Sequence, residues 1–182
     1  SVSWLLQYAN PLVKVTIVPR GQALGAAWYL PEERQITTKA QLLDQMISLL
    51  GGRAAEEIVF GEVSTGALND LERVTKQAYA MVVYYGLDKE IGNISFYDSS
   101  GQSEYGFQKP FSDKTAEKID AQIRSMVEEA YNRAKTILIE NREKLDALAT
   151  ILVEREVIFR EDVENIYGKR PWDEEKTDEQ QA

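Results

Sequence analysis

Asp70 is the first side chain to consider for chemistry, because it stands at the start of a long predicted helix in the stretch STGALNDLERVT. A carboxylate in the first turn of a helix interacts favourably with the helix dipole, by about 0.3–1 kcal/mol. Asn69 as N-cap, with Glu72 three residues later, would form an imperfect capping box. From the residues alone, a capping role is therefore the simplest interpretation of Asp70.

The sequence excludes several other kinds of active site. It contains no histidine and no cysteine, which removes Ser-His and Cys-His nucleophile pairs, disulfides and thiolate metal sites. No spacing favours Ser-Lys catalysis, and no G-x-x-x-x-G-K-[ST] stretch exists to bind a nucleotide as a P-loop does. The adjacent acids Glu56-Glu57 and Glu128-Glu129 would point about 100° apart on a helix. Taken alone, the chain shows no complete active site.

Composition indicates one soluble domain with a hydrophobic core. The 182 residues are 43% hydrophobic and 28% charged, and no run of 18 apolar residues could form a membrane-spanning helix. The net charge of −9 argues against nucleic acid as a partner, because phosphate binding needs a cationic surface. Five acids and one lysine lie in DEEKTDEQQA, so we expect residues 172–182 to be an acidic disordered tail.

Residues 1–30 predict the end of a helix followed by two strands. Helical spacing in residues 1–10 stops at Asn10-Pro11, so we expect a helix that begins upstream of Ser1. In LVKVTIVPRG, alternation of Val13, Val15 and Ile17 predicts a half-buried strand. A second strand follows over residues 23–30, with one face formed by Leu24, Ala26, Trp28 and Leu30. Its small residues 25–27 suit tight packing, the commoner explanation, or an extended partner laid along the strand.

Helical periodicity dominates the rest of the chain. A capping box at Thr38 and Gln41 predicts a helix ending at Phe60-Gly61. Gly51-Gly52 inside it suggests close approach of another helix, or a break between two shorter helices. The next helix should end at Gly86, with one face formed by Leu71, Val74, Ala78, Val82 and Tyr85.

After Gly86 we expect a short strand over residues 91–98, a polar loop over 99–112, and three further helices. The first of these is long and capped by Ser112 or Asp113, the second covers residues 145–152, and the third lies in EDVENIYG. The predicted fold class is therefore mainly α (α+β): a helical, bundle-like domain with a small β-sheet near its N-terminus.

Four stretches together resemble one family: VKVTIVPRG, ALGAAWYLPEE, LLGGRAAEEIVFGE and STGALNDLERVTKQAYAMV. They are similar to the peptidase domain of the FtsH-type ATP-dependent zinc metalloproteases, the membrane-anchored AAA+ proteases of bacteria, mitochondria and chloroplasts. The resemblance runs from about Trp4 to about Pro171, so residues 1–171 are expected to form this metallopeptidase domain.

The resemblance implies a zinc site to which this chain contributes one ligand. In the family, two histidines of a His-Glu-x-x-His helix bind Zn²⁺, and the glutamate is the general base. The third ligand is the aspartate that corresponds to Asp70. His-Glu-x-x-His is absent here, and the resemblance places its second histidine about two residues before Ser1. We therefore expect no catalytic residue in this chain, weak zinc binding, and no activity from this part alone.

The resemblance also implies how substrate and partners would be bound. Substrate would add a strand along an exposed sheet edge, here expected at Leu24, Gly25, Ala26, Ala27, Trp28 and Tyr29. The intact protein would be a homo-hexamer with one Zn²⁺ per subunit, an upstream AAA+ domain for ATP, and upstream membrane anchors. It would degrade unfolded and membrane proteins at a bacterial or organelle inner membrane, with this domain in the cytoplasm or its equivalent.

Two other interpretations remain open at this point. A degenerate relative could keep the fold and the ring contacts as a non-catalytic oligomerisation or scaffold module, without the histidines. The residues encoded just before Ser1 distinguish this scaffold from the enzyme. A metal-free helical adaptor unrelated to proteases would require the long motif matches to be coincidental.

Overall fold

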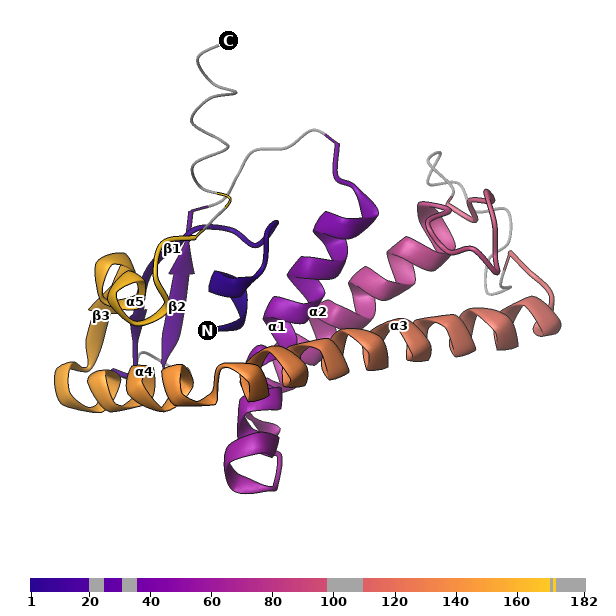
Figure 1. The fold of residues 1–182 in the computed structure, drawn as a ribbon. Helices are drawn as coiled ribbons and strands as arrows, with labels where there is room; N and C mark the ends of the chain where they lie inside the picture. Colours follow the sequence, from indigo (N-terminus) through magenta and orange to yellow (C-terminus); the bar gives the residue numbers. More distant parts are fainter. Residues whose placement is uncertain (20–24, 31–35, 98–109, 171, 173–182) are drawn as a thin grey trace, which may run out of the picture.

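The computed structural model describes residues 1–19, 25–30, 36–97, 110–170 and 172. Five α-helices and a three-stranded sheet form most of it, so the predicted mainly α class is confirmed (Figure 1). In chain order the elements are η1 Val2–Leu5, β1 Leu12–Thr16, β2 Ala26–Tyr29, α1 Lys39–Phe60, η2 Thr65–Ala67, α2 Leu68–Tyr79, η3 Ala80–Tyr84, α3 Asp113–Glu140, α4 Arg142–Arg155, β3 Val157–Phe159 and α5 Arg160–Tyr167.

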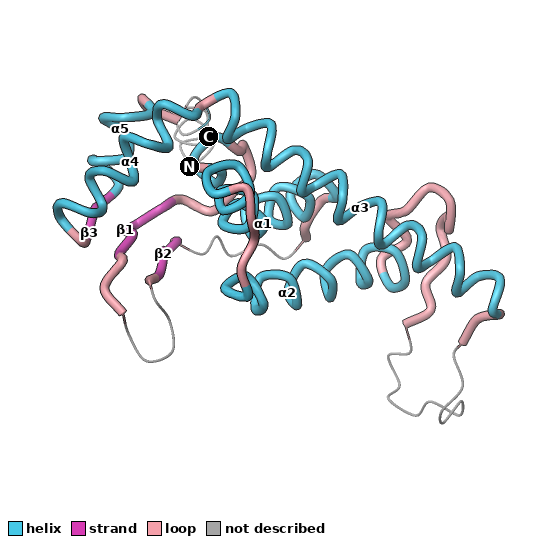
Figure 2. Tube along the Cα trace, turned by 90° about the horizontal axis from the view of Figure 1, so that it is seen from below, coloured by secondary structure: helices cyan, strands magenta, loops and turns pink. Residues whose placement is uncertain are grey.

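The sheet is antiparallel, with strand order β2-β1-β3. One of its faces packs against η1, α4 and α5 around a small core (Figure 2), formed by Trp4, Leu12, Leu148, Ile158, Val163 and Tyr167. The sequence did not predict β3, a three-residue strand whose partner β1 lies far away in the chain. The sheet therefore joins the two ends of the chain and is not confined to the N-terminal part.

The predicted buried face of the first strand is wrong. Val13 and Ile17 are 45% and 42% exposed, whereas Leu12 is buried. The pairing of β1 with β2 shifts register between Leu12 and Lys14, which marks a β-bulge. Because a bulge adds one residue to the alternation, Leu12 and Val15 both face the small core and Val13 does not. Ile17 lies beyond the last residue of β1.

Helix α1 begins and ends as predicted. The Thr38 hydroxyl accepts a hydrogen bond from the Gln41 amide, the Gln41 side chain accepts one from the Thr38 amide, and Gly61 closes the helix in the left-handed conformation. Gly51-Gly52 does not break the helix. A Cβ on Gly51 would lie 2.9 Å from Val2 Cγ2, so the close neighbour is η1 and not another long helix. A Cβ on Gly52 would meet nothing within 4 Å.

Helix α2 continues into a π-helical turn, η3, that changes which residues are buried. Val74, Ala78 and Val82 are buried as predicted, but Tyr85 is 60% exposed. The Tyr85 amide bonds to the Ala80 carbonyl, five residues back. This wider turn inserts one residue into the helical period and rotates Tyr85 away from the core.

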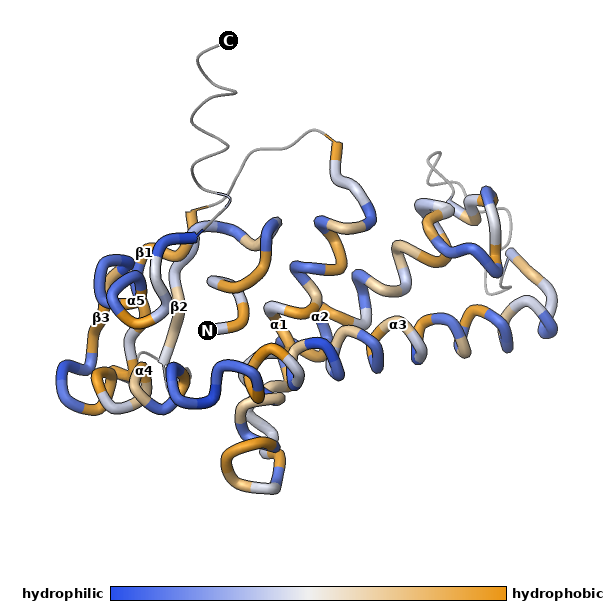
Figure 3. Tube along the Cα trace, viewed as in Figure 1, coloured by the Kyte–Doolittle hydropathy of each residue, from blue (hydrophilic) through white to orange (hydrophobic). Residues whose placement is uncertain are grey.

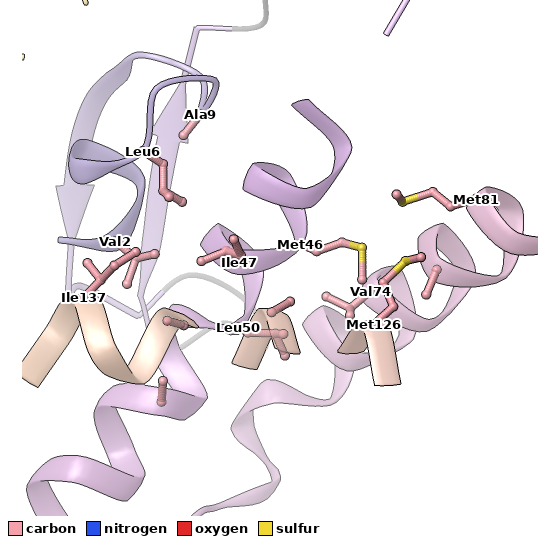
Figure 4. Close-up of a cluster of buried hydrophobic side chains, with 14 of the residues drawn as sticks. Val2, Leu6, Ala9, Met46, Ile47, Leu50, Val74, Met81, Met126 and Ile137 are labelled. Carbon is pink, nitrogen blue, oxygen red and sulfur yellow. The ribbon is translucent and has the colours of Figure 1, made fainter. Parts of the chain in front are cut away.

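The main core lies where α1, α2 and α3 meet. Methionine and aliphatic side chains from these helices and from η1 converge there (Figure 4), including Val2, Met46, Leu50, Val74, Met81, Met126 and Ile137. Along α3, apolar residues recur with the helical period and face this core (Figure 3). Ser112, one of the two predicted caps, accepts a hydrogen bond from the Thr115 amide.

Two further predictions need correction. The segment 1–10 forms only the 3-10 turn Val2–Leu5, after which Leu6 is extended, so the predicted helix ends several residues early. The predicted strand over 91–98 is not formed by its described residues, 91–97. Most of the predicted loop 99–112 and the acidic tail from 173 onward lie outside the described residues.

The adjacent glycines of α1 provide a matched test of the packing. Gly52→Ala is expected to stabilise the chain by about 0.5–1 kcal/mol, because alanine favours the helix and its methyl group meets open space. Gly51→Ala should not give this gain, because Val2 must move to admit the methyl group. Chemical denaturation of both variants measures the difference, and equal stabilisation by the two would contradict the close contact between η1 and α1.

Candidate metal ligand and substrate edge

Asp70 is the third residue of α2, and it does not cap the helix. The N-cap is Ala67, which makes no side-chain capping bond, so the predicted capping box of Asn69 and Glu72 is wrong. Glu72 instead accepts a hydrogen bond from Lys76, one turn further along the helix. Asp70 does lie in the first turn of α2, where the helix dipole favours a carboxylate, but no side chain caps the helix.

The loop before Asp70 is fixed to α1 by one carboxylate. Glu56 accepts hydrogen bonds from the Ser64 amide at 3.0 Å and from the Ser64 hydroxyl at 2.8 Å. Ser64 Oγ in turn accepts one from the Gly66 amide at 3.1 Å. These bonds hold the pKa of the Glu56 carboxyl below its usual range and set the position at which α2 begins.

The Asp70 carboxylate is half-buried, and no described residue donates a hydrogen bond to it. Partial burial raises the pKa of Asp70, and the nearby Arg73 guanidinium partly opposes this rise. A desolvated carboxylate without hydrogen bonds is costly in its ionised form, and a bound cation would offset that cost.

Two contacts of α1, one with α2 and one with the loop before α2, locate Asp70 relative to α1. The Gln77 amide nitrogen donates to the Leu42 carbonyl at 2.7 Å, and Ser64 bonds to Glu56 near the other end of α1. The two helices are thus antiparallel, and Asp70 lies between these contacts along α2. It is level with the part of α1 that contains Gly51 and Gly52.

The described side chains around Asp70 do not form a complete metal site. Within the described ranges, no three His, Cys, Asp or Glu side chains gather in a way that could hold a metal ion. The sequence has no histidine or cysteine to complete such a group. Asp70 therefore fits the role of one carboxylate ligand, and the other described residues supply no further ligands beside it.

Strand β2 lies at the edge of the sheet, as the predicted substrate strand requires. The Leu30 amide donates to the Pro11 carbonyl at 2.8 Å, so the backbone groups of Leu30 point toward β1. Because the direction of the amide and carbonyl groups alternates along an antiparallel strand, those of Trp28 and Ala26 also point toward β1. Those of Ala27 and Tyr29 point away from it. In the part of the chain that the structure describes, no strand pairs with this side of β2.

The structure describes five of the six residues predicted for the substrate edge. Ala26, Ala27, Trp28 and Tyr29 form β2, Gly25 precedes it, and Leu24 lies outside the described residues. A Cβ on Gly25 would come within 2.7 Å of the Thr16 carbonyl oxygen. This glycine is therefore required by the close approach of β1 and not by an external partner.

Of the cavities that adjoin β2, two are lined by both Tyr29 and Ser48. The first is lined by Ala9, Asn10, Tyr29, Gln45, Ser48, Leu49, Arg73 and Gln77. The second extends along α1 past Gly52 and Ala55 to Ser1. Sequence reasoning missed Arg73 and Gln77, although their spacing of three and seven residues from Asp70 places all three on one face of α2.

Comparison with known proteins relates this geometry to one family. Residues 1–166 match the model of peptidase family M41. The chain is 63% identical over 172 residues to an ATP-dependent zinc metalloprotease FtsH of Parabacteroides distasonis, covering 94% of this chain and 25% of that protein. It is 53% identical over 173 residues to the protein of the same name in Rhodothermus marinus, again covering 94% and 25%.

A mouse relative, the mitochondrial inner membrane m-AAA protease component AFG3L2, is 44% identical over 177 residues, which cover 97% of this chain and 22% of that protein. The chain thus spans about a quarter of the length of the relatives it matches. Within the described residues, no helix combines the length and apolar character needed to cross a bilayer. These matches exclude an adaptor unrelated to proteases.

The raised pKa of Asp70 predicts how stability depends on pH in the absence of metal. The folded state holds the Asp70 proton more tightly than the unfolded chain, so stability falls as pH rises from the usual value of 3.8 through the raised pKa. The Asp70→Asn side chain stays neutral at every pH. This variant should therefore have a slightly raised melting temperature at pH 7 and an unchanged one below pH 3.8, the usual pKa of an aspartate.

Glu72→Gln is the matched control on the same helix. The bond from Lys76 lowers the pKa of Glu72, so this substitution should lower the melting temperature at pH 7 or leave it unchanged. Both effects can be followed by thermal unfolding monitored by circular dichroism. A lower melting temperature for Asp70→Asn at pH 7 would show that the carboxylate is stabilised by its surroundings.

Proposed function

We propose, since the chain belongs to peptidase family M41, that it is the peptidase domain of a membrane-anchored, ATP-dependent zinc metalloendopeptidase. Relatives that match over more than nine-tenths of this chain are named as ATP-dependent zinc metalloproteases. The observation that carries the proposal is the Asp70 carboxylate, half-buried at the start of α2 and not hydrogen-bonded by any described residue.

Asp70 would be one of three protein ligands to Zn²⁺, and two histidines of a segment upstream of Ser1 would be the others. A bound Zn²⁺ would supply a Lewis acid and a water molecule activated near neutral pH. The cavity between Ser1 and α1 supports this arrangement, because it is lined by the small residues Ser48, Gly51, Gly52 and Ala55. A segment attached to Ser1 could pack there, level with Asp70.

This chain's own residues would hold and orient the substrate. The outward-facing amide and carbonyl groups of Ala27 and Tyr29 would pair with an extended peptide, as added strands do at sheet edges. Because Tyr29 and Ser48 also line the cavities next to α1, a peptide on this edge would pass close to the face of α2 that carries Asp70.

The remaining features of the whole protein are proposals on the same basis. They are an upstream AAA+ domain for ATP, assembly as a hexamer, substrates that are unfolded or membrane proteins, and anchoring in a bacterial or organelle inner membrane. Residues 1–171 would form the peptidase domain and 172–182 a disordered tail. On this proposal the present residues alone would be inactive, because the general base and two ligands lie elsewhere.

Loss of the proposed ligand tests the assignment in the full-length protein. Asp70→Ala should lower zinc affinity at least about tenfold and abolish ATP-dependent hydrolysis of an unfolded protein, while ATP hydrolysis persists. Zinc content and fluorogenic proteolysis provide the readouts. Asp113→Ala is the matched control, because Asp113 also lies in the first turn of a helix, at the far end of α3 (Figure 1).

Equal zinc content in the Asp70→Ala and Asp113→Ala proteins would overturn the ligand assignment. The residues before Ser1 provide a separate test of the enzyme itself. A His-Glu-x-x-His segment there agrees with the proposal, and its absence would indicate the non-catalytic scaffold.

The substrate edge can be tested by removing one outward-facing amide. Ala27→Pro in the full-length protein should lower kcat/KM for a short peptide by about tenfold or more, because proline cannot donate to an added strand. Proline is tolerated at sheet edges, so the melting temperature should change little. Ala27→Ser keeps the amide and should retain activity. An unchanged kcat/KM for Ala27→Pro would place the substrate elsewhere.

A further inference from the structure

We infer that the cavity between β2, α1 and α2 is a side-chain pocket that selects an acidic residue of the substrate. The inference rests on the proposed function, because it requires a peptide laid along β2. It assigns the selectivity to Arg73, a residue that the sequence analysis did not single out. The cavity has a volume of about 220 Å³, which is enough for one amino-acid side chain.

Most of the residues that line this cavity from the two helices are polar. Two apolar residues, Ala9 and Leu49, line it together with Tyr29, and the other five lining residues are Asn10, Gln45, Ser48, Arg73 and Gln77. An apolar substrate side chain would displace water from the polar groups that still need it, such as the exposed Arg73 guanidinium, without replacing its hydrogen bonds. The cavity therefore suits a side chain that forms hydrogen bonds.

The hydrogen bonds already present show which groups can bind a ligand. The Gln77 amide nitrogen donates to the Leu42 carbonyl and, at 3.4 Å, to the Gln45 side-chain oxygen. The donor that Gln45 can still offer is therefore its own amide nitrogen. Together with the Arg73 guanidinium, this places donors on the α1 and α2 sides of the cavity, where the ligand must supply acceptors.

The positive charge of Arg73 favours a carboxylate as the acceptor group of the ligand. Among the described residues that line the cavity, Arg73 is the only cation, in a chain whose net charge is −9. The neighbouring Asp70 offsets part of that positive charge. With Asp70 bound to a dication, the guanidinium would be available to an incoming carboxylate, which it can bind through two parallel hydrogen bonds.

The cavity lies where a residue next to the cleaved bond would be. Tyr29, whose backbone faces the free side of β2, lines it from the sheet. Arg73 follows Asp70 by one turn of α2, a rise of about 5 Å. A peptide paired with β2 would thus place one side chain in the cavity while its backbone passes the proposed metal ligand.

Cleavage of matched peptides by the full-length protein tests this selectivity. The peptides carry Glu, Gln, Leu or Lys at each of the two positions on either side of the cleaved bond. At one position the unaltered protein should cleave the Glu peptide with a kcat/KM about tenfold above the Lys peptide. Arg73→Gln should reduce this ratio to near one, Arg73→Glu should invert it, and Arg73→Lys should retain part of it.

Lys76→Gln is the matched control, because Lys76 is an exposed cation of α2 that pairs with Glu72 and does not line the cavity. It should leave the ratio unchanged. Zinc content and kcat/KM for the Leu peptide show whether each Arg73 variant retains its metal site. Unchanged discrimination in Arg73→Glu, with the Leu peptide still cleaved, overturns this inference alone. No cleavage of any peptide by the unaltered protein overturns the proposed function and this inference with it.

Discussion

The hydrogen bonds from Ser64 to Glu56 attach the loop before α2 to α1, and the candidate site depends on this attachment. A single carboxylate accepts two hydrogen bonds from Ser64 and fixes where α2 begins. Further along the same pair of helices, Gln77 bonds to the Leu42 carbonyl. Between these two contacts Asp70 is held on a rigid element, half-buried and without a hydrogen-bond donor among the described residues. The fold thus maintains a carboxylate whose ionised form Arg73 stabilises only in part.

Such a carboxylate has a cost that a functional site can explain. Structural acids are usually exposed or paired, as Glu72 is with Lys76. Asp70 is partly desolvated, and the charge of its neighbour Arg73 compensates only in part. With a bound divalent cation, the ionised Asp70 carboxylate would stabilise the folded state instead of destabilising it, because the cation would favour the charged form. The same cation would leave Arg73 available to the substrate, so the metal ligand and the proposed pocket would be electrostatically coupled.

Local chemistry explains which parts of the fold could be predicted from the sequence. The capping box at Thr38 and the end of α1 at Gly61 depend on residues within one turn, and both were predicted correctly. The same holds for the cap of α3, which was predicted at Ser112 or Asp113 and lies at Ser112. The bulge in β1, strand β3 and the π-helical turn depend on partners far away in the chain or on the packing of the core. Periodicity contains no information about them, and the predictions for Val13, Ile17 and Tyr85 failed for that reason.

The candidate site shows the same division. Asp70 was identified as a ligand through a family motif, whereas the residues alone favoured a role at the helix N-terminus, of which the structure shows the first-turn position but no side-chain cap. The importance of Arg73 became visible only when α1, α2 and β2 were seen around one cavity. The central claim is tested most directly by a crystal structure of the full-length protein with Zn²⁺. The account predicts an Asp70 carboxylate oxygen about 2.0–2.2 Å from the ion, beside two histidines. A zinc ion held by a different third residue, with Asp70 turned toward solvent, would contradict it.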